Sequence, residues 1–113
     1  MANQFSTQYK RKHPRYISRA KAYIMRILDE EAVVKDIGIT GCCIAYNKKQ
    51  VNLKLHEIYV IHVLPEDEKL EKFELLAESR WFHSKGDSCE IGFSIISSPY
   101  LFSQYKHQCR RIR

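Results

Sequence analysis

The chain has 113 residues, of which 44% are hydrophobic, so it can form one compact domain with a core but not two. It contains no apolar run long enough for a membrane helix, and its N-terminus lacks the apolar segment of a secretory signal, so we expect a cytoplasmic protein. The net charge of +6 divides into +7 for residues 1–28, −5 for residues 29–98 and +4 for residues 99–113. Cationic ends around a mildly acidic middle predict a local anion site rather than a general affinity for polyanions.

The N-terminal third of the chain is predicted to be extended. Residues 1–9 are polar with a single Phe, and we expect them to form a flexible arm. The basic run from Lys10 to Arg15 contains Pro14, which has no N–H and disfavours helix at His13. From Ile17 to Leu28 small and apolar residues alternate with polar ones, which predicts a strand whose inner face carries Ala20, Ala22, Ile24 and Leu28.

Five further segments are predicted to be strands because they alternate or are rich in β-forming residues: Ala32–Ile37, Cys42–Tyr46, Ile58–Leu64, Phe73–Phe82 and Cys89–Ile95. Polar or glycine-containing segments separate them, at 29–31, 36–41, 47–50, 65–68 and 83–88, and residues 51–57 are ambiguous. In the fourth of these strands the alternation predicts that Trp81 lies in the core together with Phe73, Leu75 and Ala77.

The C-terminal segment changes its pattern. Ser97-Ser98-Pro99 has the composition of a helix start, with a capping serine and a proline in the first turn. Apolar residues then recur at helical spacing at Leu101, Phe102, Tyr105, Cys109 and Ile112. We therefore predict a mainly β fold: a six-stranded antiparallel barrel over 10–98, followed by a C-terminal α-helix over 99–113 that packs on or beside it.

The cysteines and histidines give no sign of a metal or catalytic centre. There is no C-x-x-C, and the five histidines are scattered, so Cys42, Cys43, Cys89 and Cys109 are predicted to be free thiols and no metal is expected. The sequence shows no nucleophile–base motif and no glycine-rich loop before a helix. We therefore expect neither catalytic residues nor a cofactor, and the protein is predicted not to be an enzyme.

Two short motifs carry the chemistry of a candidate ligand site. The first is Arg11-x-x-x-Arg15, with Lys10 and Lys12 beside it. The second is Asp36-x-Gly38-x-x-Gly41, in a predicted turn. An arginine can grip phosphate through two parallel hydrogen bonds and can also stack on a purine ring. A carboxylate accepts from the donor edge of guanine, and glycines let the backbone approach a flat ligand closely, so the two motifs together predict a site for guanine nucleotides.

Each motif also has a structural interpretation that the sequence leaves open. The basic run can be a solvated tail, and Asp36 can cap its own turn. Gly38 and Gly41 can supply positive φ angles. The cationic residues near the C-terminus are interpreted as the solvated end of the predicted helix: Lys106, Arg110, Arg111 and Arg113.

The order and spacing of the two motifs resemble those of the PilZ domain family. Its members open with an R-x-x-x-R loop, matched here by Arg11 and Arg15, and continue through a strand to a D/N-x-S-x-x-G turn, matched by Asp36 and Gly41. The resemblance covers roughly residues 9–97 and includes Trp81 and Ile91-Gly92-Phe93. It implies a receptor for the bacterial second messenger cyclic di-GMP, with Lys10, Arg11, Lys12, Arg15, Asp36, Gly38 and Gly41 as ligand-binding residues. A stand-alone domain of this kind implies a downstream partner protein, in processes such as motility or virulence.

Two positions refine what this resemblance implies. Gly38 stands where the family usually has serine, and the missing hydroxyl removes one hydrogen bond of about 0.5–1.5 kcal/mol. Binding is therefore expected to be weakened by roughly threefold to tenfold rather than abolished. Lys10 precedes the first arginine of the motif, a position at which family members with a basic residue often take up a stacked pair of ligands.

Two other classes of function compete with a receptor. A PilZ domain that has lost its ligand and acts as a protein-interaction adaptor is one, and Gly38 is its first sign. A nucleic-acid-binding barrel is the other, supported by the basic ends and the aromatic content. The acidic middle and the lack of an exposed aromatic-plus-basic strand argue against it, so no specific nucleic acid and no membrane are expected as partners.

Overall fold

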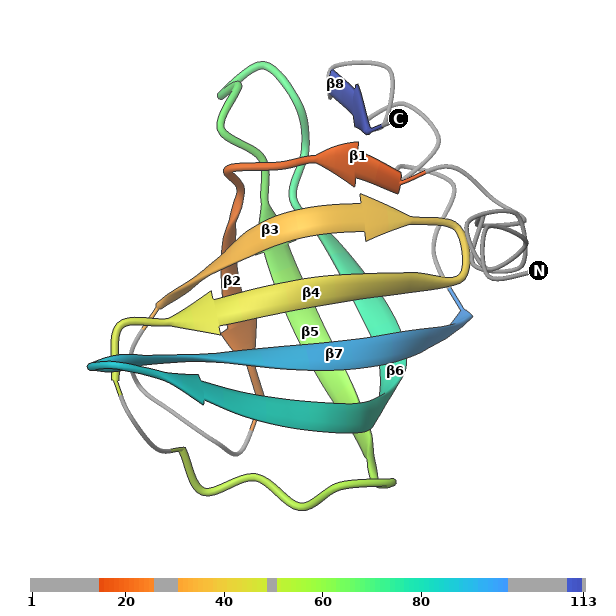
Figure 1. The fold of residues 1–113 in the computed structure, drawn as a ribbon. Coiled ribbons are helices and arrows are strands. Elements are labelled where there is room, and N and C mark those ends of the chain that lie inside the picture. Colours follow the sequence, from red (N-terminus) through yellow and green to blue (C-terminus); the bar gives the residue numbers. More distant parts are fainter. Residues whose placement is uncertain (1–14, 26–30, 49–50, 98–109, 113) are drawn as a thin grey trace, which may run out of the picture.

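The computed structural model describes residues 15–25, 31–48, 51–97 and 110–112. In these residues the strands form one antiparallel sheet (Figure 1), and β5 shows the alternation of buried and more exposed side chains most clearly. The strands are β1 (Arg15–Ile17), β2 (Lys21–Ile24), β3 (Ala32–Gly38), β4 (Gly41–Tyr46), β5 (Ile58–Leu64), β6 (Phe73–Lys85), β7 (Ser88–Ser97) and β8 (Arg110–Ile112).

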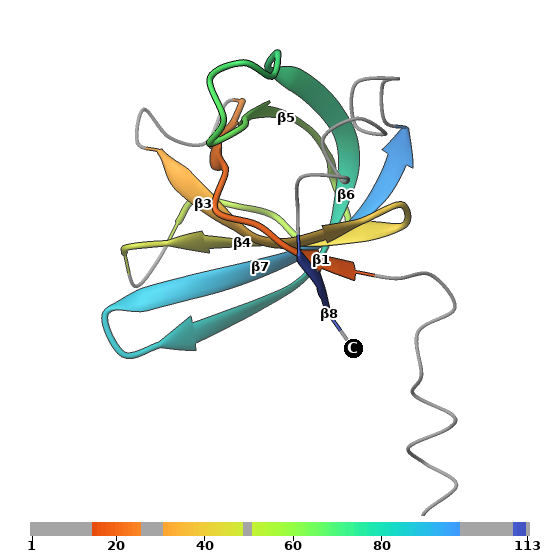
Figure 2. The same ribbon diagram turned by 90° about the horizontal axis from the view of Figure 1, so that it is seen from above.

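Six of these strands close into a barrel. They follow the order β2-β5-β6-β7-β4-β3, and β3 pairs again with β2 to close the ring. Seen from above in Figure 2, the strands surround the core, while β1 and β8 continue the sheet beyond β3. The predicted six-stranded antiparallel barrel is therefore confirmed, with β1 and β8 as additions at one edge.

The core is formed by the inward-facing side chains of all six barrel strands. Its largest fully buried members are Tyr46, Ile24, Ile37, Ile44, Ile61, Leu75, Ile91, Val34 and Val63. The hairpin of β6 and β7 extends beyond this core, where residues Arg80–Lys85 are exposed (Figure 2). Its turn is shorter than the predicted 83–88, because Gly86 adopts a left-handed φ of 60° and reverses the chain within two residues.

The first predicted strand is divided in two. β1 pairs with the end of β3 and β2 with its beginning, while β2 also pairs with β5 across the seam of the barrel. Ser18 lies at the break, where its buried hydroxyl accepts a hydrogen bond from the Ala20 N–H at 3.1 Å. Ala20, Ala22 and Ile24 are buried as predicted, and Leu28 lies outside the described residues.

The C-terminal helix prediction is wrong over the part that the structure describes. Arg110–Ile112 forms strand β8, which pairs antiparallel with β1. Helical spacing of apolar residues did not reveal this, because the open edge of β1 offers hydrogen-bonding groups that a sequence pattern does not show. Residues 98–109 lie outside the described part.

Among the residues that the structure describes, no helix is long and apolar enough to cross a membrane.

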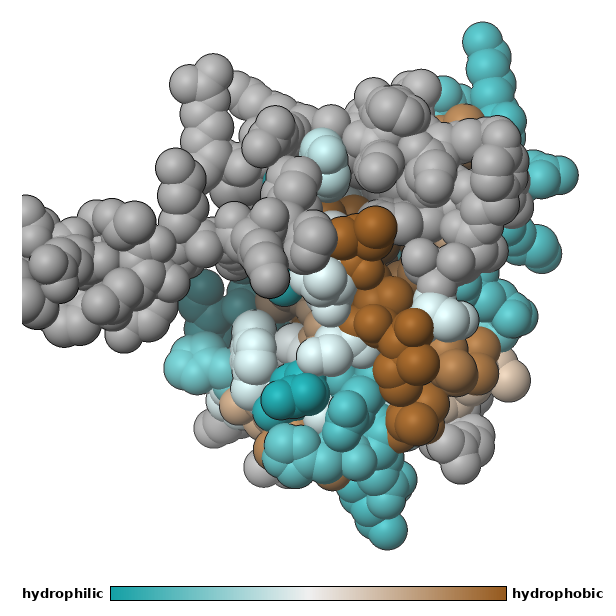
Figure 3. Space-filling view, turned by 90° about the vertical axis from the view of Figure 1, so that its right-hand side faces the viewer, coloured by the Kyte–Doolittle hydropathy of each residue, from teal (hydrophilic) through white to brown (hydrophobic). Residues whose placement is uncertain are grey.

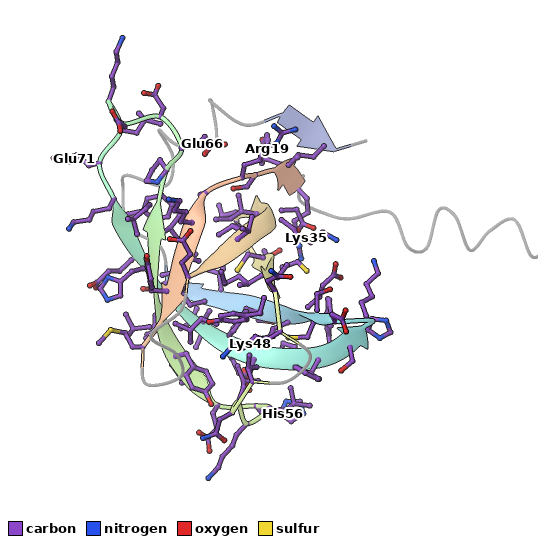
Figure 4. The ribbon with its side chains drawn as sticks, turned by 90° about the vertical axis from the view of Figure 1, so that its left-hand side faces the viewer. Arg19, Lys35, Lys48, His56, Glu66 and Glu71 are labelled. Carbon is purple, nitrogen blue, oxygen red and sulfur yellow. The ribbon has the colours of Figure 1, made fainter. Side chains whose placement is uncertain are left out.

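The two ends of the barrel carry different side chains, and one side of the barrel has an apolar surface. Glu66 and Glu71 lie on the loop at one end, and His56, which has a left-handed φ of 63°, lies at the other (Figure 4). A band of apolar surface crosses the side shown in Figure 3. Exposed Ile39, Leu76 and Ile96 lie near the end of β7, since Leu76 pairs with Ser97 and the Ile95 N–H donates to the Thr40 carbonyl at 2.9 Å.

Candidate functional site

A β-bulge in β3 turns Asp36 out of the barrel. Val34 pairs with Ile44 and Asp36 with Cys43, so Lys35 is an extra residue without a counterpart on β4. The bulge resets the alternation, which leaves Val34 and Ile37 fully buried and directs Asp36 to the outer face. The predicted turn at 36–41 is correspondingly shorter: Asp36 and Gly38 belong to β3, and only residues 39–40 separate it from β4.

A second bulge turns Trp81 to the same outer face. Ser79 pairs with Phe93 and Trp81 with Gly92, so Arg80 is the extra residue on β6. Ser79 stays fully buried, and its hydroxyl donates to the Lys54 carbonyl at 2.6 Å. Trp81 is instead 46% exposed, so its predicted place in the core is wrong. Bulges of this kind commonly redirect a side chain next to a binding site.

The two bulges create one row of outward residues across four adjacent strands. Asp36 pairs with Cys43, Cys43 with Gly92, and Gly92 with Trp81. This row crosses a cavity of about 580 Å³ on the outside of the barrel, lined by Arg15, Lys35, Asp36, Thr40, Cys42, Cys43, Arg80, Trp81, Glu90, Gly92, Phe93 and Ser94. The cavity is large enough for a nucleotide base and its phosphate, because ligand sites begin at about 300 Å³.

One ion pair in the cavity joins the two sequence motifs. The Arg15 Nη1 donates to Asp36 Oδ1 at 2.7 Å, and both side chains are 21% exposed. Strand pairing holds this geometry, because Arg15 lies opposite Gly38 and Ile17 opposite Asp36. The contact uses one of the five N–H donors of the guanidinium group, and a fixed fork of this kind suits phosphate.

A glycine is needed at position 41 because other atoms lie too close for a side chain there, and not because of its backbone conformation. A Cβ at Gly41 would lie 2.6 Å from Arg15 Nη2 and 2.8 Å from the Phe93 carbonyl oxygen. Neither Gly38 nor Gly41 has a positive φ, since Gly86 is the only glycine with one in the described chain. The interpretation of these two glycines as positive-φ residues is therefore wrong, and close approach explains Gly41.

The indole of Trp81 covers the backbone of Gly92. A Cβ at Gly92 would lie 2.1 Å from both Cε2 and Nε1 of the ring, so only glycine permits this contact. The ring remains about half exposed and forms part of the cavity wall. An exposed indole at the side of a polar cavity can stack on a planar base.

The cysteines beneath the cavity are protonated thiols. Cys42 faces the core and Cys43 the cavity, and both are buried and free, as is Cys89. Burial raises the pKa of Cys42 to about 12 and that of Cys43 to about 11, and the carboxylates of Asp36 and Glu90 raise the Cys43 pKa further. Neither thiol has the low pKa of a nucleophile, and the free-thiol prediction is confirmed for these three residues.

A second group of charges borders the cavity. Lys35, labelled in Figure 4, forms a hydrogen-bonded ion pair with Glu90, and Lys85 Nζ lies 3.8 Å from the same carboxylate. The hydrogen bond raises the pKa of Lys35 and lowers that of Glu90. Arg80 Nη1 lies 3.9 Å from Glu78. The cavity thus carries compensated charges on one side and the Arg15–Asp36 pair on the other.

The structure brings together part of the predicted site. Arg15, Asp36 and Gly41 meet at the cavity, and Gly38 is buried in β3 opposite Arg15. Lys10, Arg11 and Lys12 lie outside the described residues.

Sequence reasoning missed Trp81, Gly92 and Arg80 as cavity residues. The feature that marks this part of the cavity is the pairing of Gly92 with Trp81 on the neighbouring strand. This pairing depends on the bulge at Arg80, so it can be recognised only when the strand register is known.

Comparison with known proteins supports the fold. No family model matches the chain, and none of the curated proteins matches it in sequence. Among solved structures it is similar to the Bacillus subtilis inhibitor of motility (MotI/DgrA), with a TM-score of 0.68 and 16% identity, over 88% of this chain and 49% of that one. The chain therefore spans about half the length of that protein. At this identity the likeness shows the fold alone, and it agrees with the barrel that the sequence predicts.

Proposed function

We propose that this chain is a receptor for cyclic di-GMP, which binds at the cavity on the outer face of β3, β4, β7 and β6. The contact between Arg15 and Asp36 carries the proposal, because it unites two motifs that are 21 residues apart in sequence. The PilZ-like fold supports it, since that family is the one that the motifs resemble.

The cavity residues suit the parts of this ligand. The guanidinium of Arg15 offers N–H donors to a phosphate, and the carboxylate of Asp36 accepts from the N1–H and N2–H₂ edge of guanine. The exposed face of Trp81 offers a stacking surface for the base. Phosphate and guanine recognition therefore come from adjacent strands of one sheet.

The proposed mechanism is a conformational switch without catalysis. Lys10, Arg11 and Lys12 precede β1, and their like charges repel one another until an anionic ligand neutralises them. The ligand then fixes this segment over the barrel face near Asp36 and changes the surface offered to a downstream protein in the cytoplasm. Hydrogen exchange of residues 1–16 is expected to slow when cyclic di-GMP is added, and unchanged exchange would contradict the switch.

Isothermal titration of cyclic di-GMP tests the receptor. The wild-type chain is expected to bind at micromolar or lower concentration, and Arg15→Ala to abolish binding, because a charge-assisted phosphate contact is lost and Asp36 loses its partner. Arg19→Ala is the matched control, since Arg19 is exposed and does not line the cavity. If Lys10 marks a stacked pair of ligands, the titration gives two ligands per chain.

The adaptor is the second candidate, and Gly38 in place of serine is the observation that favours it. A wild-type chain that gives no heat with cyclic di-GMP, and does not retain single-stranded nucleic acid, would belong to this ligand-independent class. Salt-dependent retention of single-stranded nucleic acid would instead favour the nucleic-acid-binding barrel.

A further inference from the structure

Two arginines lie at the two ends of one row of outward positions. Glu78 of β6 pairs with Ser94 of β7, and Ser94 pairs with Gly41 of β4. Directly opposite residues in antiparallel strands belong to the same face of the sheet, so these three positions form a second row across the cavity. Arg80 Nη1 lies 3.9 Å from Glu78 at one end of this row. At the other end, Arg15 Nη2 lies 2.6 Å from the place of a Cβ on Gly41.

The two guanidinium groups therefore lie on either side of Ser94. Figure 1 shows β7 between β6 and β4, and neighbouring strands lie about 4.8 Å apart, so the backbones of Glu78 and Gly41 are about 10 Å apart. Ser94, Arg15 and Arg80 all line the cavity. An anion above Ser94 would thus have a guanidinium group on each side, and two planar forks of this kind suit a phosphate.

The backbone next to Arg80 is held from the other edge of β6. The hydroxyl of the preceding Ser79 donates to the Lys54 carbonyl at 2.6 Å. The Ser79 N–H donates to the Glu57 carbonyl at 3.0 Å, and its carbonyl accepts from the His56 N–H at 2.7 Å. These bonds attach β6 to the segment before β5, directly ahead of the bulge. The Arg80 side chain therefore starts from a fixed point at the cavity, and it can reach a ligand by rotation about its own bonds.

Arg80 has the longest contact with an acid among the cavity cations that the structure describes. Its Nη1 is 3.9 Å from Glu78, beyond hydrogen-bonding distance, and the two side chains are 53% and 33% exposed. Arg15 and Lys35 are instead hydrogen-bonded to their acidic partners. An exposed ion pair without a hydrogen bond contributes little to stability. Arg80 can therefore exchange Glu78 for a phosphate at small cost.

We propose that Arg80 is a further ligand-binding residue, which faces Arg15 across Ser94 and turns from Glu78 to a phosphate of the ligand. It acts together with the basic segment that the proposed function already assigns to the ligand. For the identity of that ligand the inference rests on the proposed function, whereas the anion site between the two arginines does not. The carboxylate of Glu78 competes with the ligand for Arg80, so it weakens binding.

Two matched pairs of variants of the full chain test this assignment. Arg80→Gln and Arg19→Gln each remove one arginine, and of these two residues Arg80 lines the cavity. Glu78→Gln and Glu74→Gln each remove one carboxylate from β6, and Glu74 contacts His62 at 3.4 Å instead of a cavity cation. Each variant is titrated at physiological ionic strength with cyclic di-GMP by calorimetry and with inorganic pyrophosphate by its effect on the melting temperature. The melting temperature without ligand checks that every variant is folded.

Opposite changes are expected for the arginine and the glutamate. Arg80→Gln should raise the Kd for cyclic di-GMP about tenfold and reduce the stabilisation by pyrophosphate, because a charge-assisted hydrogen bond is lost. Glu78→Gln should lower the Kd roughly twofold to fivefold, since no carboxylate then competes for Arg80. The two controls should stay within about twofold of the wild type, because exposed charges more than about 8 Å from the ligand are largely screened at this ionic strength.

The possible outcomes separate this inference from the proposed function. An unchanged Kd in Arg80→Gln, or equal losses in Arg80→Gln and Arg19→Gln, would overturn the role of Arg80. Weaker binding by Glu78→Gln would overturn the exchange of partners. Pyrophosphate stabilisation that depends on Arg80 without any binding of cyclic di-GMP would support the anion site and refute the receptor. A wild type that binds neither molecule would refute both.

Discussion

The indole of Trp81 lies against the backbone of Gly92, so closely that a Cβ on the glycine would meet the ring at 2.1 Å. Strand pairing places the two residues opposite each other on β6 and β7, and the bulge at Arg80 turns the ring outward. A residue with no side chain thus determines where the largest exposed aromatic ring of the cavity lies. Adding a single methyl group at Gly92 therefore tests whether the ring lies there.

Gly92→Ala is expected to displace the indole with little loss of stability. Because Trp81 is 46% exposed, its ring can swing into solvent, so the free energy of unfolding should change by less than about 1 kcal/mol. The tryptophan emission should shift to longer wavelength, since Trp81 is the only tryptophan. The loss of one stacked base should weaken cyclic di-GMP binding about 5- to 150-fold.

Trp81→Ala provides the control for this change. It should weaken binding to a similar extent, and the double variant should be no weaker than either single one, because both act on the same contact. Additive losses would show that Gly92 affects the ligand independently of the ring.

Gly41→Ala is expected to lower stability more than Gly92→Ala. Its Cβ would lie 2.8 Å from the Phe93 carbonyl, and this backbone group cannot swing away as a side chain can. Overpacking of this kind costs about 1–3 kcal/mol, measurable by urea unfolding. The same methyl would push the Arg15 guanidinium away from its place at 2.6 Å, so ligand binding should weaken as well.

Gly86→Ala separates a general loss of stability from an effect at the site. A Cβ at Gly86 would meet no other atom within 4 Å, but the φ of 60° there costs alanine about 1–2 kcal/mol. This variant should therefore be destabilised with an unchanged Kd. If it loses affinity as strongly as Gly41→Ala, the argument from Arg15 displacement is wrong.

Gly38→Ser is expected to tighten cyclic di-GMP binding about threefold to tenfold, because it supplies a hydrogen bond of about 0.5–1.5 kcal/mol. The backbone permits a side chain, since Gly38 lies in β3 without a positive φ. Gly38→Ala adds bulk without the hydroxyl, and calorimetry should rank serine above both alanine and glycine. Equal affinities for the serine and alanine variants would dismiss the hydroxyl argument.

Stability is expected to fall above about pH 9 because of the buried thiols. Burial raises the pKa of Cys42 from 9.0 to about 12, so only the unfolded chain releases this proton between these values. The resulting loss of stability is fully absent below pH 9.0 and reaches about 1.4 kcal/mol at pH 10 for this one thiol. Urea unfolding under reducing conditions measures it.

Cys42→Ala isolates this contribution from the other groups that titrate in alkali. Its free energy of unfolding should fall less between pH 8 and pH 10 than that of the wild type, by about 1.4 kcal/mol. Parallel pH profiles for the two proteins would show that Cys42 does not keep its proton in the folded state.

The barrel and part of the candidate site can be predicted from the sequence alone. Alternation with a period of two located the barrel strands, because a sheet that covers a core must bury every second side chain, as Ile61 and Leu75 show. The two motifs predicted that Arg15 and Asp36 belong to one site, since their residue types suit phosphate and guanine. The 2.7 Å contact between them agrees with that prediction.

Which residues line the cavity depends on how the strands pair, and the sequence does not show this. The bulges at Lys35 and Arg80 shift the alternation by one residue, and this shift turns Asp36 and Trp81 to the same outer face. A sequence pattern assumes unbroken alternation, so it placed Trp81 in the core. The pairing of β8 with β1 was equally hidden, because hydrogen bonds between the two ends of a chain depend on where the barrel leaves an edge open.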